Sequence, residues 1–295
     1  MGAVLTLACG RGTGSTCESP PAAHDRGQDG AQKQSGDDKL SFVHIDYAVR
    51  DRVAEITMRR APVNAINHDL IEDLLAAYAQ AKADPGVRAV ILTSAFEKAF
   101  SAGMDLAMIR TGRGIDLRRF LEKLYFGMHD AQYRLGKPTI AALTGPARAA
   151  GVTLAVSCDM IVASDCASIG YPEIDVGLIP AMHFVHLPRQ IGRHKAFELC
   201  FTGRPISATE AERRGLVNYV VPPDQVLAKA RELALDLASK SPMVMQLARD
   251  SFMRANDAEY RRAIENTVET ICNIIELDDA REGLAAFNEK RPPRW

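Results

Sequence analysis

The sequence predicts an α/β protein in which alternating strands and helices are followed by a helical C-terminal region. Continuous apolar runs at 87–93 and 139–143 are typical of buried parallel strands, and segments of helical periodicity separate them. Such alternation indicates βα units joined by right-handed crossovers. After about residue 209, nearly all of the apolar periodicity is helical. We therefore place an α/β core at 39–207 and a helical region at 208–295.

The composition narrows the class of protein. The 36 Lys and Arg residues nearly balance the 37 Asp and Glu residues, which disfavours a nucleic-acid-binding or polybasic membrane-binding protein. No apolar run approaches the length of a membrane span. The six cysteines include no C-x-x-C pair and no zinc-ligand spacing. We therefore expect a reducing compartment, the cytoplasm, and no metal site.

Residues 1–38 differ from the rest of the chain. They are rich in Gly, Ser, Gln and Asp, and they show no apolar periodicity after Ala8. The opening apolar stretch is short and has no Lys or Arg before it, which disfavours a secretory signal peptide. A lipid-modified Cys9 is the alternative, but the basic start and a good cleavage box are both missing. We expect a disordered tail.

The elements of the core have local signals. Two strand-like segments, 42–49 and 53–58, flank Asp51-Arg52, which predicts a β-hairpin. Asn67 can cap a helix whose apolar residues recur at helical spacing as far as Ala81. The other predicted elements are a loop at 100–106, helices at 117–135, 208–214, 225–239, 243–254 and 258–275, a short helix after the turn 145–151, and a strand at 160–163.

Two turns of small residues, at 101–105 and 145–151, each follow a predicted buried strand. Small residues let backbone N–H groups approach a ligand, and two such turns side by side would direct two donors at one carbonyl oxygen. The alternative is that the small residues only allow tight packing. Glu173 follows Pro172 among apolar residues, where partial desolvation would raise its pKa and suit it to proton transfer. A solvated loop glutamate is the alternative there.

These turns belong to a longer series of motifs. The series comprises Asn64-Ala65-Ile66-Asn67, the stretch 97–106, Cys158-Asp159, Pro172-Glu173, Gly177-Leu178-Ile179-Pro180, the stretches 199–203 and 208–217, and Phe287-Asn288-Glu289-Lys290-Arg291. In order and spacing these motifs resemble those of the crotonase (enoyl-CoA hydratase/isomerase) superfamily. The resemblance covers all of the chain except its N-terminal tail.

The resemblance implies a crotonase-like spiral of ββα units with a helical C-terminal trimerisation region. It also implies a homotrimer or a hexamer built as a dimer of trimers, and an acyl-CoA thioester as substrate. The backbone N–H groups of Met104 and Ala150 would form an oxyanion hole. Ala150 stands where the family usually has Gly, but any residue except proline supplies this donor.

The resemblance further implies that Ala102 and Met104 contact CoA. Lys98 and Lys290 match positions whose ammonium groups often meet the CoA phosphates in this family. A solvated surface lysine is the alternative for each of them.

The main departure from the family pattern is Thr153, which stands where two-glutamate hydratases carry their first catalytic glutamate. Glu173 matches the second. Thr153 can hydrogen-bond a water molecule or the substrate, but it cannot act as a base near neutral pH. Hydration of ordinary fatty enoyl-CoA is therefore open to question.

Other unusual residues lie near the matched motifs. His183 either packs at a helix start or lines the acyl pocket and assists proton transfer, since imidazole titrates near neutral pH. His186 shares its helix face, but two histidines alone make a poor metal site. Arg148 faces either the acyl pocket or the surface. Asp175 is either a second acid or a loop anchor.

We expect an enzyme that adds water to, or removes it from, an enoyl-CoA thioester through an oxyanion-stabilised enolate. Glu173 would be its general acid/base, and no cofactor is expected besides the CoA thioester substrate. The alternatives are an enoyl-CoA double-bond isomerase and a catalytically weak acyl-CoA-binding protein. A thioester hydrolase or C–C lyase also stays open, because one oxyanion hole serves several reactions in this superfamily.

Overall fold

A six-stranded sheet forms the middle layer of the protein in this computed structural model, which describes residues 41–111, 114–256 and 259–295. The strands follow the order β1-β2-β3-β4-β6-β9 across the sheet. Their bounds are β1 Ile45–Arg50, β2 Val53–Met58, β3 Ala89–Ser94, β4 Thr139–Leu143, β6 Met160–Ser164 and β9 Tyr219–Val221. The predicted hairpin of β1 and β2 is antiparallel, and every other pair in the sheet is parallel. The expected α/β class is confirmed, whereas the predicted tail 1–38 lies outside the described residues.

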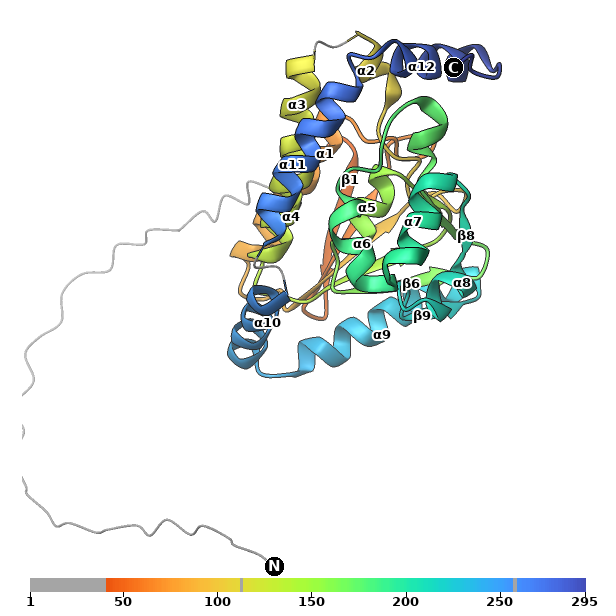
Figure 1. Ribbon diagram of the computed structural model, residues 1–295. Coiled ribbons are helices and arrows are strands. Elements are labelled where there is room, and N and C mark those ends of the chain that lie inside the picture. The colour runs from red at the N-terminus through yellow and green to blue at the C-terminus, as the bar shows by residue number, and fades with distance from the viewer. Residues whose placement is uncertain (1–40, 112–113, 257–258) are drawn as a thin grey trace, which may run out of the picture. The chain divides into compact units, whose positions relative to one another are not determined.

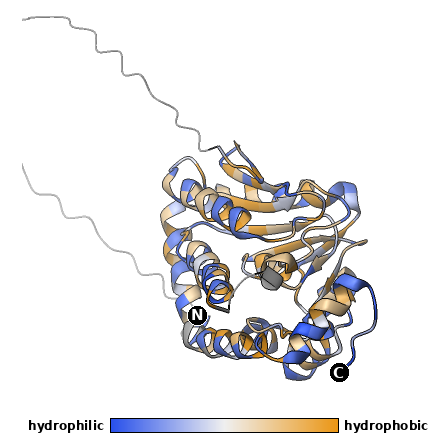
Figure 2. Ribbon diagram, turned by 90° about the horizontal axis from the view of Figure 1, so that it is seen from above, coloured by the Kyte–Doolittle hydropathy of each residue, from blue (hydrophilic) through white to orange (hydrophobic). Residues whose placement is uncertain are grey.

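The sheet is covered on both faces, so its strands alternate between two cores. On β3, Ala89 and Ile91 belong to the core that includes α9 (Val226–Ser239), while Val90 and Leu92 belong to the core that includes α1 (His68–Ala83). Figure 1 shows α9 below the strands. The helices at the periphery carry both hydrophilic and hydrophobic residues (Figure 2), as expected for helices with one buried face.

The remaining helices surround this sheet. Their bounds are α2 Leu106–Thr111, α3 Gly114–Glu122, η1 Lys123–Gly127, α4 Met128–Tyr133, α5 Ala150–Val156, η2 Pro172–Val176, α6 His183–Ile191, α7 Arg193–Thr202, α8 Ala208–Arg213, η3 Pro223–Gln225, α10 Pro242–Asn256, α11 Tyr260–Ile274 and α12 Asp278–Glu289. Three short strands, β5 Ala147–Arg148, β7 Ser168–Gly170 and β8 Ile206–Ser207, form a second sheet. None of the helices in the described ranges is long and apolar enough to cross a bilayer.

The structure differs from the sequence prediction in several elements. The helix expected at 117–135 runs from 114 to 133 and contains the π-helical turn η1. The strand β9 lies in the region expected to be helical, and three residues are too few to show a strand period. Helix α6 contains Pro188, a residue that normally indicates a helix end. Helices α7 and α12 were not predicted.

Asn64 ties together the loops that carry the first of the two small-residue turns. Its side chain is fully buried, accepts a hydrogen bond from the backbone N–H of Arg60 and donates to Ser94 Oγ and to the Phe100 carbonyl. Its backbone carbonyl accepts a hydrogen bond of 2.7 Å from Ser101 Oγ. Its φ of 50° lies in the left-handed region, which asparagine tolerates better than most residues. Asn64 therefore fixes the segment that leads to Met104.

We predict that Asn64→Ala lowers the free energy of unfolding by about 3 kcal/mol, because it removes three side-chain hydrogen bonds, two of them buried, and places alanine at a positive φ. The control is Asn67→Ala, which removes the cap hydrogen bond to the backbone N–H of Leu70 and an exposed 3.4 Å contact with Asp69, and it should cost about 1 kcal/mol. Chemical denaturation of both variants measures the difference. If Asn64→Ala lowered the free energy of unfolding no more than Asn67→Ala does, Asn64 would not be what fixes the segment leading to Met104.

Candidate active site

A cavity of about 330 Å³, which we call the Glu173 cavity, lies where the two small-residue turns meet the helical C-terminal region. Four of the predicted site residues line it: Ala102, Met104, Ala150 and Glu173. The cavity walls come from the loop after β3, from α3 and η1, from the start of α5, from η2 and from α11 and α12. Segments far apart in the sequence therefore meet at this one place.

The two turns lie side by side. Ser101 forms a parallel bridge with Ala147, and its carbonyl accepts a hydrogen bond of 3.0 Å from the backbone N–H of Arg148. Gly103 has a φ of +93°, and a Cβ atom there would lie 2.8 Å from the Arg148 carbonyl oxygen. The same position lies 3.5 Å from the Ala150 nitrogen. The close approach of the two turns therefore depends on a glycine.

This contact brings two backbone donors to the cavity. Neither the Met104 nor the Ala150 backbone N–H donates a hydrogen bond to any part of the chain that the structure describes. Both residues line the cavity. Both N–H groups are therefore free to donate to a ligand, as the donors of an oxyanion hole must be.

Ala149 directs the second donor through a strained backbone. Its φ of 49° and ψ of −123° are uncommon for a residue with a Cβ atom. Hydrogen bonds hold it on both sides: its N–H donates to the Gly170 carbonyl at 3.0 Å, and its carbonyl accepts from Val152 at 2.9 Å. The conformation therefore persists because the surrounding structure fixes it.

Glu173 is presented by the 3₁₀ turn η2. Pro172 begins the turn, and Gly177 ends it in the left-handed conformation with a φ of +73°. Helix α12 packs directly on the turn, since a Cβ atom on Gly283 would lie 2.5 Å from the Val176 carbonyl. The backbone of Glu173 is therefore held between its own turn and the C-terminal helix.

The Glu173 carboxyl group is shielded from solvent although the residue as a whole is only half-buried. Its Oε2 atom is buried and has no hydrogen-bond partner among the described residues. Burial raises the pKa of this carboxyl group from 4.5 to about 8, and a hydrogen bond with its own backbone opposes that shift. Glu173 can therefore hold or release a proton near neutral pH.

Tyr125 lines the same cavity from the π-helical turn, and the sequence analysis missed it. Burial raises the pKa of its hydroxyl, and the nearby Glu173 raises it further. The hydroxyl has no hydrogen bond to a described residue. Tyr125 is therefore a neutral donor or acceptor near Glu173. π-Helical turns often occur at functional sites. This turn would have pointed to Tyr125, but the sequence pattern does not show it.

Thr153 and His183 lie against each other and not on the cavity surface. Each is 1% exposed, and Thr153 Oγ1 lies 3.0 Å from His183 Nε2. Burial lowers the pKa of His183 well below 6.5, and His186 lowers it further, while a hydrogen bond with the Ala149 backbone opposes both effects. His183 is therefore neutral at physiological pH. Direct catalytic roles for Thr153 and His183 stay predictions.

The residues expected to bind CoA are divided between the cavity and the surface. Ala102 and Met104 line the cavity, whereas Lys98 and Lys290 are exposed and do not. Lys290 ends α12 in the left-handed conformation, and the next residue, Arg291, lines the cavity instead. Arg291 pairs with Glu282 at 2.6 Å and also with Glu289. Contacts of Lys98 and Lys290 with CoA stay predictions.

The structure also places Arg148 and Asp175, for each of which the sequence left two alternatives. The Arg148 guanidinium donates to the Ala147 carbonyl and to both oxygens of Ser168, and it does not line the Glu173 cavity. Asp175 lines the cavity but is exposed, and its carboxylate lies against Gly203.

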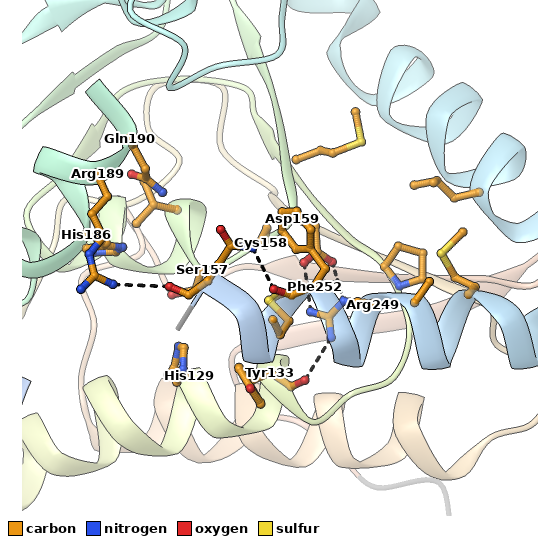
Figure 3. Close-up of a pocket in the computed structure, with 18 of the residues that line it drawn as sticks. His129, Tyr133, Ser157, Cys158, Asp159, His186, Arg189, Gln190, Arg249 and Phe252 are labelled. Atoms are coloured by element: carbon orange, nitrogen blue, oxygen red, sulfur yellow. Dashed lines mark hydrogen bonds and ion pairs between the residues drawn. The ribbon is translucent and has the colours of Figure 1, made fainter. Parts of the chain in front are cut away.

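A second cavity, of about 650 Å³, lies near the other end of α5 (Figure 3). His186 and Arg189 from α6, His129 and Tyr133 from α4, and Arg249 and Phe252 from α10 all line it. His186 therefore lies on the second cavity, not on the Glu173 cavity. Within the described part of the chain, no group of three or more potential ligand residues could hold a metal ion.

We predict that Ala149→Gly raises the free energy of unfolding by about 1 kcal/mol, because glycine adopts a positive φ without the Cβ strain. The matched control is Ala228→Gly on the exposed face of α9, where the same change should destabilise by up to about 1 kcal/mol. Chemical denaturation tests both signs. Destabilisation by Ala149→Gly would contradict the assignment of strain.

The raised pKa of Glu173 predicts a pH-dependent stability. Between pH 4.5 and about 8 the folded protein keeps a proton that the unfolded chain has lost, so the free energy of unfolding falls as the pH rises. Glu173→Gln removes this loss. Its stability relative to the wild type should therefore increase by about 1–2 kcal/mol between pH 6 and pH 8, after allowance for solvent screening.

Urea unfolding at the two pH values measures this change. Glu97→Gln, on an exposed loop, is the matched control. An equal effect of pH on the two variants would show that the Glu173 carboxyl group is not the source.

Comparison with known proteins agrees with this geometry. Residues 49–295 match the family model described as enoyl-CoA hydratase/isomerase. The chain is 36% identical over 234 residues to a putative enoyl-CoA hydratase of Thermus thermophilus, covering 79% of this chain and 92% of that protein. It is 34% identical over 244 residues to a short-chain-enoyl-CoA hydratase of Clostridium acetobutylicum, covering 81% and 92%.

The fold is similar to that of solved structures as well. An enoyl-CoA hydratase/isomerase from Xanthobacter autotrophicus superposes with a TM-score of 0.77 at 30% identity, covering 85% of this chain and 98% of that one. An enoyl-CoA hydratase from Bacillus anthracis superposes with a TM-score of 0.69 at 34% identity, covering 86% and 99%. The fold, the paired turns and the matched sequence together show that this chain belongs to the enoyl-CoA hydratase/isomerase family of the crotonase superfamily.

Proposed function

We propose that the protein adds water to, or removes it from, an enoyl-CoA thioester, with Glu173 as its only catalytic carboxylate. One observation carries this proposal. The unpartnered Oε2 atom of Glu173 belongs to a residue lining the same cavity as two free backbone N–H groups. A titratable proton carrier and an oxyanion hole are the two parts that enolate chemistry requires.

In this mechanism the thioester oxygen accepts hydrogen bonds from the backbone N–H groups of Met104 and Ala150. These donors stabilise the negative charge that develops on the oxygen as the thioester takes on enolate character. Removal of one such donor costs roughly 10²–10³-fold in rate in other enzymes. The donors are backbone groups, so the Ala150 side chain does not change their chemistry.

Glu173 moves the proton. Its ionised form removes a proton from water while the water oxygen bonds to Cβ, and the π electrons of the double bond move toward the thioester to form the enolate. The protonated Glu173 then delivers the same proton to Cα, which restores the carbonyl and the carboxylate. Every atom of the water is thereby placed on the product, and no cofactor besides the CoA thioester substrate is proposed.

Tyr125 supports the handling of the water molecule in this proposal. It is a neutral hydroxyl on the wall of the same cavity, and Glu173 disfavours its ionisation. It can hydrogen-bond the water or the new hydroxyl group without exchanging its own proton. This role supplements the single carboxylate, since Thr153 carries no charge.

The second candidate is an enoyl-CoA isomerase, and the single carboxylate favours it. An isomerase moves one proton between two carbon atoms and requires no bound water. Glu173 would remove the proton at one carbon and return it at the other, with the same oxyanion hole. A substrate with an isolated double bond distinguishes this reaction from hydration.

We also propose that the protein assembles as a trimer or a dimer of trimers. Met243, Val244, Leu247 and Phe252 of α10 are each more than 60% exposed, at 63%, 65%, 61% and 66%. Apolar side chains exposed together on one helix support a contact between subunits. Size-exclusion chromatography with light scattering measures the oligomeric state.

We predict that Glu173→Gln lowers kcat/KM for enoyl-CoA hydration roughly 10²–10⁴-fold, because glutamine has the same shape but carries no exchangeable acid proton. Loss of the conjugated-thioester absorbance, followed across short, long and aryl enoyl-CoA substrates, measures the rate. Asp175→Asn is the control, because its carboxylate lies against Gly203 and is exposed. Full activity of Glu173→Gln would refute the proposal.

The wild-type kcat/KM should rise with pH and reach a plateau above about pH 8, because the reaction requires the ionised Glu173. Below that value the rate should fall about tenfold per pH unit, as the fraction of carboxylate does. A rate that is constant between pH 6 and pH 9 would contradict the assignment of Glu173 as the base.

A further inference from the structure

The Glu173 cavity and the second cavity share three walls. Successive turns of the same elements line first one cavity and then the other. From α5, Ala150 lines the Glu173 cavity and Val156 lines the second cavity. From the helical stretch η1–α4, the corresponding residues are Tyr125 and His129. From the segment that enters α6, Ile179 lines the Glu173 cavity, and Met182 and His186 line the second. The two cavities are therefore consecutive spaces along one set of walls.

A small group of buried side chains separates them. Thr153 and Met128 each lie in the chain between a residue that lines the first space and one that lines the second, and His183 follows Met182, which lines the second space. All three side chains are 1% exposed. The contact of 3.0 Å between Thr153 Oγ1 and His183 Nε2 joins two of the three walls. We call these three residues the partition.

His183 is held in place on both sides. Its ring centroid lies 4.2 Å from that of Tyr171, and its ring stacks on His186 with centroids 5.3 Å apart. Because His183 is neutral, the partition contains no ionised group of its own. A neutral, close-packed group of this kind acts by its volume.

The second cavity suits an apolar chain. Four methionines, Met160, Met182, Met245 and Met253, line it, and methionine side chains adapt to irregular apolar ligands. Arg249 and Asp159 form an ion pair, with 2.8 Å between Arg249 Nε and Asp159 Oδ2, so their charges offset each other (Figure 3). Arg189, the other cation on this wall, belongs to the exposed rim.

We propose that the partition ends the acyl-binding site, limits the substrate to short acyl chains, and closes off a second cavity able to hold a longer chain. This inference rests on the proposed function, because it takes the Glu173 cavity as the place of the acyl thioester. It gives Thr153 and His183 a role in selecting the length of the acyl chain.

Binding of saturated acyl-CoA esters tests the inference without any turnover. Butyryl-CoA and dodecanoyl-CoA are titrated by calorimetry into the wild type, His183→Ala and Thr153→Ala. Each buried methylene group strengthens binding roughly fourfold, so access to the second cavity should improve the dodecanoyl-to-butyryl affinity ratio about tenfold or more. Thr153→Ala removes less volume and should shift the ratio less, in the same direction.

Two further variants show where the chain goes. His129→Ala enlarges the second cavity without opening the partition, so its affinity ratio should equal that of the wild type. Ala248→Phe, combined with His183→Ala, refills the second cavity and should abolish the gain. A gain that survives this refilling would show that the chain takes another path, and it would overturn the proposal.

The outcomes separate the two proposals. An unchanged affinity ratio in both partition variants, with butyryl-CoA still bound, overturns the partition alone. Wild-type preference for dodecanoyl-CoA also overturns it. Failure of every variant and of the wild type to bind either ester overturns the proposed function and the partition together.

Discussion

The burial of one unpartnered carboxyl group is the constraint on which the rest of this structure depends. Moving a carboxylate out of water is unfavourable, and here the group responds by keeping its proton up to a pKa of about 8. The turn η2 and helix α12 hold Glu173 in this position through glycine contacts that leave no room for a side chain. A looser turn would let the carboxyl group reach water, and its pKa would return toward the ordinary value.

The two small-residue turns of the site are also held in an unfavourable arrangement by the rest of the fold. Ala149 keeps a strained backbone, and the N–H groups of Met104 and Ala150 have no acceptor within the described residues. Asn64 fixes the neighbouring loop with hydrogen bonds to three separate segments. Strain and unsatisfied donors concentrated in one cavity are expected where a structure is arranged for a ligand instead of for maximal stability.

Much of this arrangement could be predicted from the sequence, because its signals are local. The hairpin, the cap at Asn67, the small-residue turns and Glu173 after Pro172 each depend on neighbours in the chain. Tyr125 and Arg291 could not be found in this way, since their places on the cavity depend on how η1 and α12 pack. Strand β9 was missed because three residues show no period.

The structure brings together two residues that look independent in the sequence. Thr153 and His183 lie thirty residues apart in the chain, yet Thr153 Oγ1 and His183 Nε2 contact each other at 3.0 Å. A glutamate at 153 would place a second buried carboxyl group against this imidazole, and a buried pair of this kind favours the charged forms of both. With threonine, His183 stays neutral and Glu173 is left as the carboxyl group that titrates in the cavity. Thr153 and His183 therefore form one buried, uncharged contact, and Glu173 keeps its unpartnered position in the cavity.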